Sequence, residues 1–184
     1  NVAKENLNRS KIDCNFLIAD ISNPEKYKND LNLNFNIDIS SLLHVRSFLD
    51  HNRIYRDIEK KDIITNPKSM CAYSYKGKYL SSDNVISNLV NHFSLWKKHI
   101  NKHGLLLLEL HGLNPSLCSL NKSLTPTIAY ESTHGYSDQF IIEYDIFLKC
   151  AQMGGFEKIE KYSKVFPHNQ LATISLNMFK LADL

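Results

Sequence analysis

Residues 104–112 read GLLLLELHG, and this stretch decides the fold of the chain. Leu105–Leu110 form a short apolar run that is suited to a buried strand and is interrupted by Glu109. His111 and Gly112 follow directly, so the strand is expected to end in polar groups. A carboxylate inside an apolar strand costs several kcal/mol unless it is paired or lies at a wet site, so Glu109 is a candidate functional residue.

The segment before this strand, residues 85–103, has a helical pattern. Its apolar residues recur on one face, opposite a face of Asn, Ser and Lys, and we expect that face, including Trp96, to pack in the core. Gly104 is expected to end the helix as a C′ glycine. The apolar face consists of Val85, Leu89, Val90, Phe93, Trp96 and Ile100.

Two further apolar runs lie upstream, and polar residues follow each of them. CNFLIA at 14–19 is followed by Asp20, and LLHVRSFL at 42–49 is followed by the sequence DHNR at 50–53. Both runs are predicted to be buried strands. Between them, Asn23 is a helix cap with Pro24 at the first helical position.

Downstream, residues 130–156 join a polar cluster to an apolar helix. Ser137 or Asp138 is a candidate N-cap for a helix that starts at Phe140, and Gly154 is a candidate stop. Two strand-like runs, 158–165 and 171–179, close the chain. The apolar positions expected on the helix are Phe140, Ile141, Tyr144, Phe147, Leu148 and Ala151.

Buried strands that alternate with helices predict an α/β domain with a largely parallel sheet, and the last two strands are expected to form an antiparallel hairpin at one edge. The 184 residues are expected to form a single domain, 1–184. Residues 54–83 are the least regular part and are a candidate insertion or lid over a site.

Composition excludes several classes of protein. Lys plus Arg number 22 and Asp plus Glu number 19, and a net charge of +3 is too small to indicate a nucleic-acid or membrane partner. The four cysteines lie far apart without a CxxC pair, as expected for free thiols in a reducing compartment. Because no apolar run is long enough for a membrane span, we expect a cytoplasmic protein.

The ends of the three predicted strands are the candidate site, because ligands of open α/β sheets lie beyond the carboxyl ends of the strands. Asp20 is either a ligand or a turn residue. His51 and His111 are either functional or simply hydrogen-bonded near loops. His134 and Gln139 could both point into one site, with the imidazole as a base or metal ligand, although their spacing is a poor metal signature.

Three blocks of the sequence together resemble one family. They are HVRSFLDHNRIY at 44–55, LWKKHINKHGLLLLELHGLNP at 95–115 and TPTIAYESTHGYSDQFIIEYDIFLKCAQMGGF at 125–156. These blocks are similar to class I S-adenosylmethionine methyltransferases, of the C-methyltransferase type found in apratoxin-like polyketide synthase loading modules and their stand-alone relatives. The resemblance extends from about Cys14 to Phe179. It implies a Rossmann-like, mostly parallel sheet with an antiparallel C-terminal hairpin.

The resemblance also implies roles for individual residues. The methyl donor, S-adenosylmethionine, would lie against Asp20 and Ile21 at its adenine and against Ser47, Phe48 and Leu49 at its methionine moiety. Asp50 and His51 would face the substrate, and His134 would orient or deprotonate it. Glu109 is a further candidate catalytic residue because of its place in an apolar strand. His134 and Gln139 match the ligands of a divalent metal ion, iron or manganese, that some relatives hold as a Lewis acid. The substrate would be an acyl thioester or acyl group on an acyl carrier protein.

One departure from the family is clear. The glycine-rich loop that follows the first strand is absent, and the sheet is expected to lack its first strands and expose apolar edges. The chain is then the C-terminal portion of a longer enzyme or a degraded relative, and a non-catalytic module that docks to a synthase or carrier protein is the alternative function. A nicotinamide-dependent enzyme is disfavoured because no GxGxxG follows any strand. The six glycines are Gly77, Gly104, Gly112, Gly135, Gly154 and Gly155.

Overall fold

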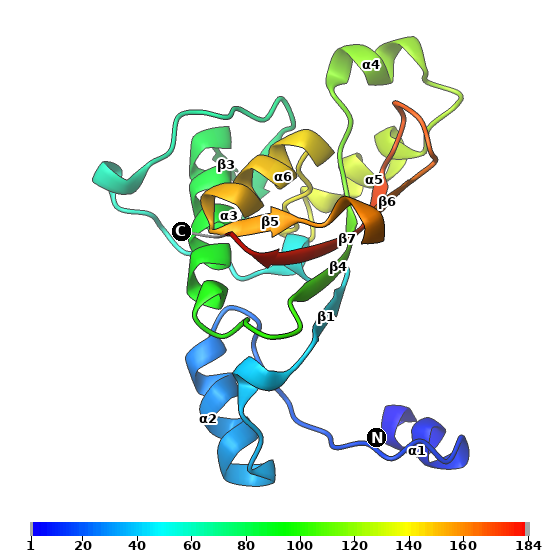
Figure 1. Cartoon of the computed structure of the whole chain (residues 1–184). Coiled ribbons are helices and arrows are strands. Elements are labelled where there is room, and N and C mark those ends of the chain that lie inside the picture. The colour runs from blue at the N-terminus through cyan, green and yellow to red at the C-terminus, as the bar shows by residue number, and fades with distance from the viewer. Residues whose placement is uncertain (1, 183–184) are drawn as a thin grey trace.

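A mixed five-stranded sheet with helices beside it forms the body of the protein (Figure 1). The computed structural model describes residues 2–182, and in this range nothing is stated about the side chains of residues 3, 8 and 130–132. The helices are α1 (Val2–Arg9), α2 (Pro24–Phe35), α3 (Ser82–Lys97), α4 (Pro115–Leu120), α5 (Thr127–His134) and α6 (Tyr144–Met153). The strands are β1 (His44–Ser47), β2 (Tyr73–Tyr75), β3 (Lys78–Leu80), β4 (Leu105–Leu110), β5 (Phe156–Lys158), β6 (Lys164–Phe166) and β7 (Ile174–Leu181).

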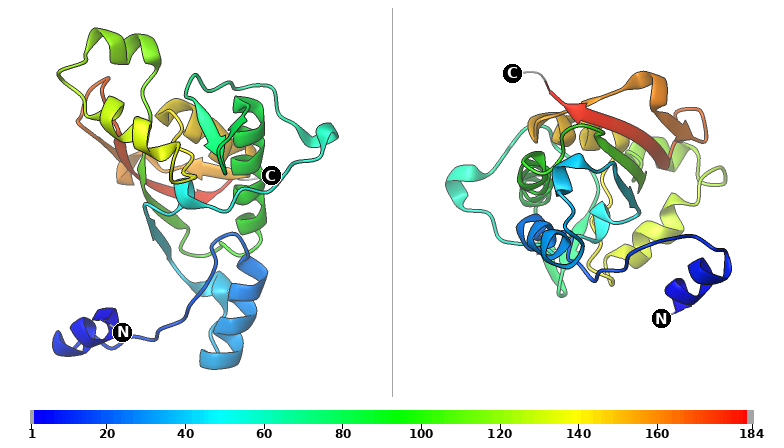
Figure 2. Two further views of the ribbon diagram at one scale, coloured as in Figure 1. Left: turned by 180° about the vertical axis from the view of Figure 1, so that it is seen from behind. Right: turned by 60° about the horizontal axis from the view of Figure 1, so that its bottom comes forward.

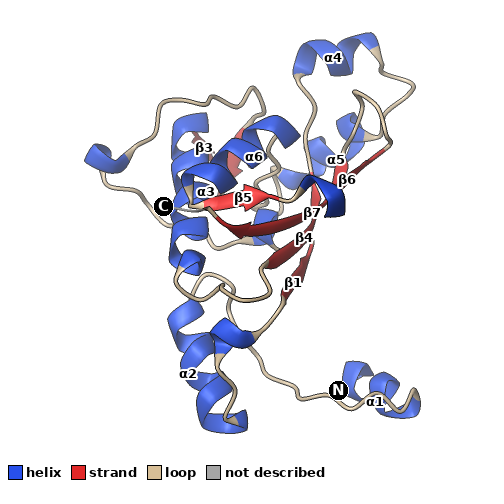
Figure 3. Ribbon diagram, in the orientation of Figure 1, coloured by secondary structure: helices blue, strands red, loops and turns tan. Residues whose placement is uncertain are grey.

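Strand β4 is the predicted apolar run, and its bounds are those expected from the sequence. It pairs in parallel with β1, with His44 opposite Leu105, and antiparallel with β7, with Leu105 opposite Phe179. Strand β7 in turn pairs antiparallel with β5 and β6. The α/β class and the antiparallel C-terminal strands are therefore confirmed (Figure 3).

The core lies where α3 and α6 pack against each other and the sheet. The ring of Phe93 on α3 contacts Phe147 on α6 edge-on at a centroid distance of 5.6 Å, and Phe156 on β5 at 5.9 Å. Gly154 ends α6, as predicted, and the close packing of Phe93 leaves room only for glycine there, because an added Cβ would come within 2.3 Å of the Phe93 Cβ. Within residues 2–182, no helix is both long and apolar enough to cross a bilayer.

The predicted strand at 14–19 is wrong. This segment is an irregular connection between α1 and α2, and Ile18 is 94% exposed. Figure 2 shows α1 set apart from the sheet at the end of this connection. Among the strands of residues 2–182, only β4 pairs with β1, so residues 14–19 have no strand beside them. An apolar run becomes a strand only when its backbone groups find a partner strand.

The helix predicted to start at Phe140 is also wrong in its first part. Helix α6 begins at Tyr144, and Phe140, Ile141 and Ile142 are all buried in an extended segment. Their backbone is held from both sides, since Phe140 N donates to His51 O and Gly112 N donates to Ile142 O. Three consecutive buried residues fit an extended chain that has neighbours on both sides. They do not fit a helix of which one face is buried, because three consecutive residues do not share a helix face.

Two details of the predicted caps change accordingly. Ser137 and Asp138 do not cap a helix, because Glu143 occupies the N-cap position of α6 and His134 is the last residue of α5. Helix α3 ends at Lys97, before the predicted end at 103. Gly104 is therefore not a C′ residue. Its φ of +79° favours glycine, and an added Cβ would come within 2.4 Å of Phe179 O at the entry into β4.

Candidate active site

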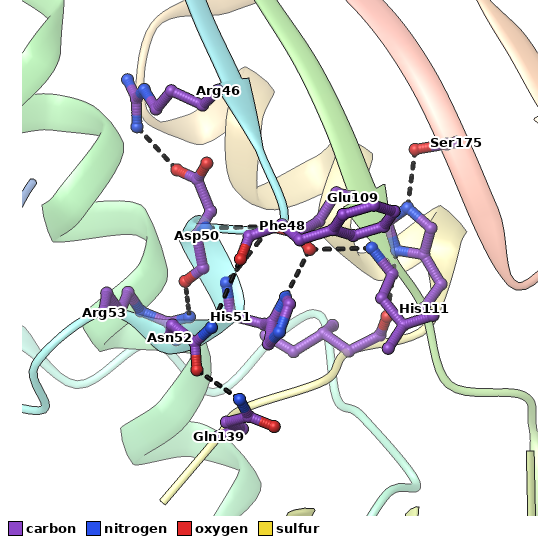
Figure 4. A network of polar contacts seen from close by, with 12 residues as sticks. Arg46, Phe48, Asp50, His51, Asn52, Arg53, Glu109, His111, Gln139 and Ser175 are labelled. Carbon is purple, nitrogen blue, oxygen red and sulfur yellow. Dashed lines mark hydrogen bonds and ion pairs between the residues drawn. The ribbon is translucent and has the colours of Figure 1, made fainter. Parts of the chain in front are cut away.

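Glu109 joins the carboxyl ends of β1 and β4 (Figure 4). Its side chain is 1% exposed, and one carboxylate oxygen accepts hydrogen bonds from the backbone N–H groups of Asp50 (2.9 Å) and His51 (3.2 Å). The other oxygen accepts from Leu110 N at 2.7 Å and lies 2.5 Å from His51 Nδ1. This buried carboxylate is thus fully hydrogen-bonded, which removes the penalty that an unpaired charge would carry.

The contact with Glu109 sets the orientation of His51. An ionised carboxylate only accepts, so the imidazole carries its proton on Nδ1 and presents the lone pair of Nε2 on the other side of the ring. The His134 ring lies edge-on to it at a centroid distance of 6.0 Å. The structure therefore brings together three predicted catalytic residues, Glu109, His51 and His134, from β4, the end of β1 and the end of α5.

Asp50, the fourth predicted catalytic residue, has a different environment. Its carboxylate points away from His51 and accepts from Arg46 Nη1 at 2.6 Å, with His92 Nε2 3.0 Å away (Figure 4). Burial opposes its ionisation, but Arg46 and His92 outweigh burial and lower the pKa of Asp50 to about 2. Asp50 is therefore a fixed negative charge that holds Arg46 and His92 in place.

Arg53 belongs to the polar run 50–53 that follows the predicted strand, although the sequence assigns it no role of its own, and it anchors the turn that carries His51. Its Nε donates to Asn88 Oδ1 at 2.8 Å, Nη1 donates to Asp50 O at 2.9 Å, and Nη2 donates to Val85 O at 3.1 Å. Burial lowers its pKa to about 10. Because the turn that carries His51 is tied to α3 through Arg53, the imidazole is attached to two rigid elements.

The sequence left His111 as either a functional residue or a histidine that is simply hydrogen-bonded near a loop. The structure favours the second interpretation. Its Nδ1 lies 3.2 Å from Ile142 O and its Nε2 lies 2.7 Å from Ser175 Oγ. A carbonyl only accepts, so Nδ1 carries the proton and Ser175 donates to Nε2. Burial lowers the pKa of His111 to about 3, so the ring is neutral. It fixes the extended segment that carries Gln139 and Phe140.

Residues 135–139 form a wall beside His51. Gln139 Nε2 donates to Asn52 Oδ1 at 2.5 Å, and Ser137 Oγ donates to Gln139 Oε1 at 3.2 Å. The β2–β3 hairpin holds this wall, since Ser74 Oγ donates to Gly135 O at 2.5 Å and Lys76 N donates to Asp138 Oδ1 at 2.7 Å. The candidate lid of residues 54–83 therefore contacts the wall, and its role as a lid stays a prediction.

The donor set for a metal ion is small. Of the described residues, no three or more His, Cys, Asp or Glu side chains are grouped so that they could hold one. His134 and Gln139 would supply one imidazole and one amide oxygen, and the amide oxygen already accepts from Ser137. These residues do not by themselves fit a metal centre, and their assignment as ligands stays a prediction.

A cavity of about 360 Å³ lies beside β1, with Tyr27 of α2 and Trp96 of α3 on its wall. Asp20, Ile21 and Leu49, three of the residues expected at the methyl donor, line it together with Arg46 and Trp96. Ser47 and Phe48 are on the same strand end but do not line it. Asp20 Oδ1 also accepts from Ser22 N at 2.8 Å, so Asp20 both shapes a turn and borders the cavity.

The sheet, its antiparallel C-terminal strands and the polar strand ends define a Rossmann-like methyltransferase domain. A protein-family model described as "AprA MT2-like domain" matches residues 1–177, and the chain belongs to this family. The domain is therefore that of a methyltransferase enzyme, as the resemblance implied, and the family implies S-adenosylmethionine as the methyl donor. A search of curated proteins finds no match.

Proposed function

We propose that this methyltransferase transfers a methyl group from S-adenosylmethionine to a carbon of an acyl thioester, presented on an acyl carrier protein. The single observation that supports the proposal most is the 2.5 Å contact between Glu109 and His51 Nδ1, beneath a second imidazole from His134. A histidine held by a buried carboxylate is suited to act as a general base. The cytoplasmic location is a further proposal, and it rests on composition alone.

The chain's own residues account for the proton transfer. His51 Nε2 would accept the proton from the carbon next to the thioester carbonyl, and Glu109 would stabilise the imidazolium that results. His134 would donate a hydrogen bond to the acyl oxygen, where negative charge develops. When bound, S-adenosylmethionine supplies an electrophilic methyl group on a sulfonium. No step of this proposal depends on a metal ion.

The cavity beside β1 is the site that we propose for the methyl donor. Its volume of about 360 Å³ falls in the range of small-molecule pockets, roughly 300–1,000 Å³. Arg46, on its wall, has two buried nitrogens, Nε and Nη2, without a hydrogen-bond partner in residues 2–182, which suits a site for a polar ligand. Leu49 borders the cavity and is followed directly by Asp50 and His51, so the two sites adjoin along the chain.

The proposal is tested with His51→Gln in the full chain. With an acyl thioester and methyl-labelled S-adenosylmethionine, turnover is expected to fall by about 10²- to 10⁴-fold, because the general base is lost. The affinity for S-adenosylhomocysteine is expected to stay the same. His134→Ala should likewise remove turnover and spare that affinity. The exposed His168→Gln is the matched control. Full turnover by His51→Gln, or a label found on oxygen, would contradict the proposal.

A further inference from the structure

Arg46 combines burial with incomplete hydrogen bonding. Its side chain is 5% exposed, and Nη1 donates to Asp50 at 2.6 Å. Its guanidinium carbon lies 4.3 Å from the centroid of the Trp96 ring. Nε and Nη2 are also buried, and neither finds a hydrogen-bond partner within residues 2–182. The Asp50 carboxylate thus pairs with one nitrogen of Arg46, and the other two nitrogens remain without a hydrogen-bond partner in this range.

Arg53 shows how different this state is. It lies just after the turn that follows β1, is 2% exposed, and donates from all three of its side-chain nitrogens. A buried polar group left unpaired costs about 1–3 kcal/mol, and more when it is charged. All three side-chain nitrogens of Arg53 are therefore hydrogen-bonded, whereas two of the three nitrogens of Arg46, with three N–H bonds between them, are not.

The unused nitrogens of Arg46 form a specific shape. The N–H bonds of Nε and Nη2 point in parallel from one side of the planar guanidinium, and this pair matches the two oxygens of a carboxylate. Asp50 occupies Nη1 and leaves the pair open. A ligand with a carboxylate fits this pair better than a single neutral acceptor does.

Arg46 and Trp96 both belong to the wall of the 360 Å³ cavity, whose wall also includes the exposed Asp20. A negative ligand group is repelled by the Asp20 carboxylate and attracted by the Arg46 guanidinium. Within this cavity, a carboxylate is therefore expected at the Arg46 end. Since Nε and Nη2 are closed to solvent here, wall side chains must shift to admit it, and Leu49 on the wall is 43% exposed.

We propose that Arg46 binds the carboxylate of the methionine part of the methyl donor, through a side-on pair of hydrogen bonds from Nε and Nη2. This inference rests on the proposed donor site. It makes Arg46 the residue that distinguishes the whole donor from its nucleoside fragment. Trp96, over which the guanidinium lies, is the only tryptophan of the chain and reports on the cavity.

The test compares two probes by Trp96 fluorescence and by calorimetry on the full chain. S-adenosylhomocysteine carries the carboxylate, and 5′-methylthioadenosine has the same nucleoside and thioether without it. The unsubstituted protein is expected to bind the first probe about 10- to 100-fold more tightly, as for charge-assisted hydrogen bonds. Arg46→Gln is expected to remove most of this ratio and leave the affinity for 5′-methylthioadenosine unchanged.

Two variants separate binding from folding. Arg46→Lys keeps a charge beside Asp50 but lacks the parallel pair of N–H groups. It should therefore fold, and the ratio of its affinities for the two probes should fall to the square root of the unsubstituted protein's ratio or lower. Arg53→Lys, at the fully bonded arginine, is expected to lower stability and keep the ratio. A ratio that is unchanged in both Arg46 variants would overturn the inference, and so would an unsubstituted protein that binds neither probe.

Failure of the inference and failure of the proposed function give different results. If Arg46→Lys keeps the binding ratio while His51→Gln loses turnover, the role of Arg46 is wrong and the proposed reaction stands. If Arg46→Gln loses the ratio but no acyl thioester is methylated, Arg46 binds the donor as proposed and the proposed acceptor is wrong.

Discussion

The two sides of β1 differ in how completely their polar groups are hydrogen-bonded. On the side of β4, the Glu109 carboxylate accepts from three backbone N–H groups and contacts His51 Nδ1. On the other side, Val45 is 61% exposed, and among the strands of residues 2–182 none besides β4 pairs with β1. Arg46, which lines the cavity beside β1, has two buried side-chain nitrogens without a hydrogen-bond partner in the same range.

This difference indicates a division of roles. The β1–β4 junction is a rigid scaffold, because every polar atom of Glu109 is held by its neighbours, and it can position His51 without a ligand. The outer side of β1 has unsatisfied hydrogen-bonding capacity and apolar exposure, which are features of a surface that binds something. The predictions below test this contrast.

The largest effect is expected for Glu109→Gln. The amide presents N–H groups toward backbone N–H groups, so the junction loses acceptors and should be destabilised by about 2–4 kcal/mol. Chemical denaturation measures the change. The exposed Glu157, which pairs with Lys180 at 3.1 Å, offers the matched control: Glu157→Gln should change stability by no more than about 0.5 kcal/mol. If the two substitutions lowered the free energy of unfolding equally, the hydrogen bonds of Glu109 would contribute no more to stability than a surface ion pair.

A second effect concerns pH. The folded-state pKa of His111 is about 3, below the usual value of 6.5, so the unfolded chain takes up a proton that the folded chain does not. Stability is therefore expected to fall as the pH decreases from 6.5 toward 3, by up to about 1.4 kcal/mol per pH unit from this residue. His44 and His92 have pKa values lowered by burial and act in the same direction.

Denaturation curves between pH 4 and 6.5 measure this slope for His111→Gln and for the exposed control His168→Gln. The first variant should reduce the slope, and the slope that remains comes from the other buried histidines. The lowered pKa of Asp50, about 2, acts at more acid pH, where stability is lost as its carboxylate becomes protonated. If the stability of His111→Gln depends on pH as steeply as that of the unsubstituted protein, His111 is not held neutral in the folded state.

The smallest effect is expected on the outer side of β1. Val45 is 61% exposed, so Val45→Ala should change the free energy of unfolding by less than about 0.5 kcal/mol. A loss above about 1.5 kcal/mol would show that a partner covers this edge in solution. Repeating the measurement over a range of protein concentrations would then distinguish a second copy of the chain from a ligand.

Much of the fold could be predicted because its signals are local. The run LLLLEL at 105–110 forms β4 with the expected bounds, and Glu109 was a candidate because a carboxylate stood in an apolar strand. Periodicity located α3, and the Asn23–Pro24 pair located the start of α2, where the Asn23 side chain accepts from Lys26 N. These features depend on residues that are close together in the chain.

The errors arose where distant residues decide. CNFLIA at 14–19 has the composition of a strand but no strand beside it, and Phe140–Ile142 are extended because His51 O and Gly112 N bond their backbone. Arg46 and His92 had no sequence signal of their own, and Arg53 was recognised only as part of the polar run 50–53. Their importance follows from burial next to Asp50, 42 positions before His92.

The sequence by itself determined the class of the chain, the position of its central strand and the residue types at the strand ends. Apolar periodicity and helix caps are set by neighbours along the chain, and the match to the AprA MT2-like family rests on the sequence alone. Only the tertiary structure decided which polar groups are satisfied. Glu109 is fully paired and Arg46 is not, because hydrogen bonds between distant segments depend on how the segments pack.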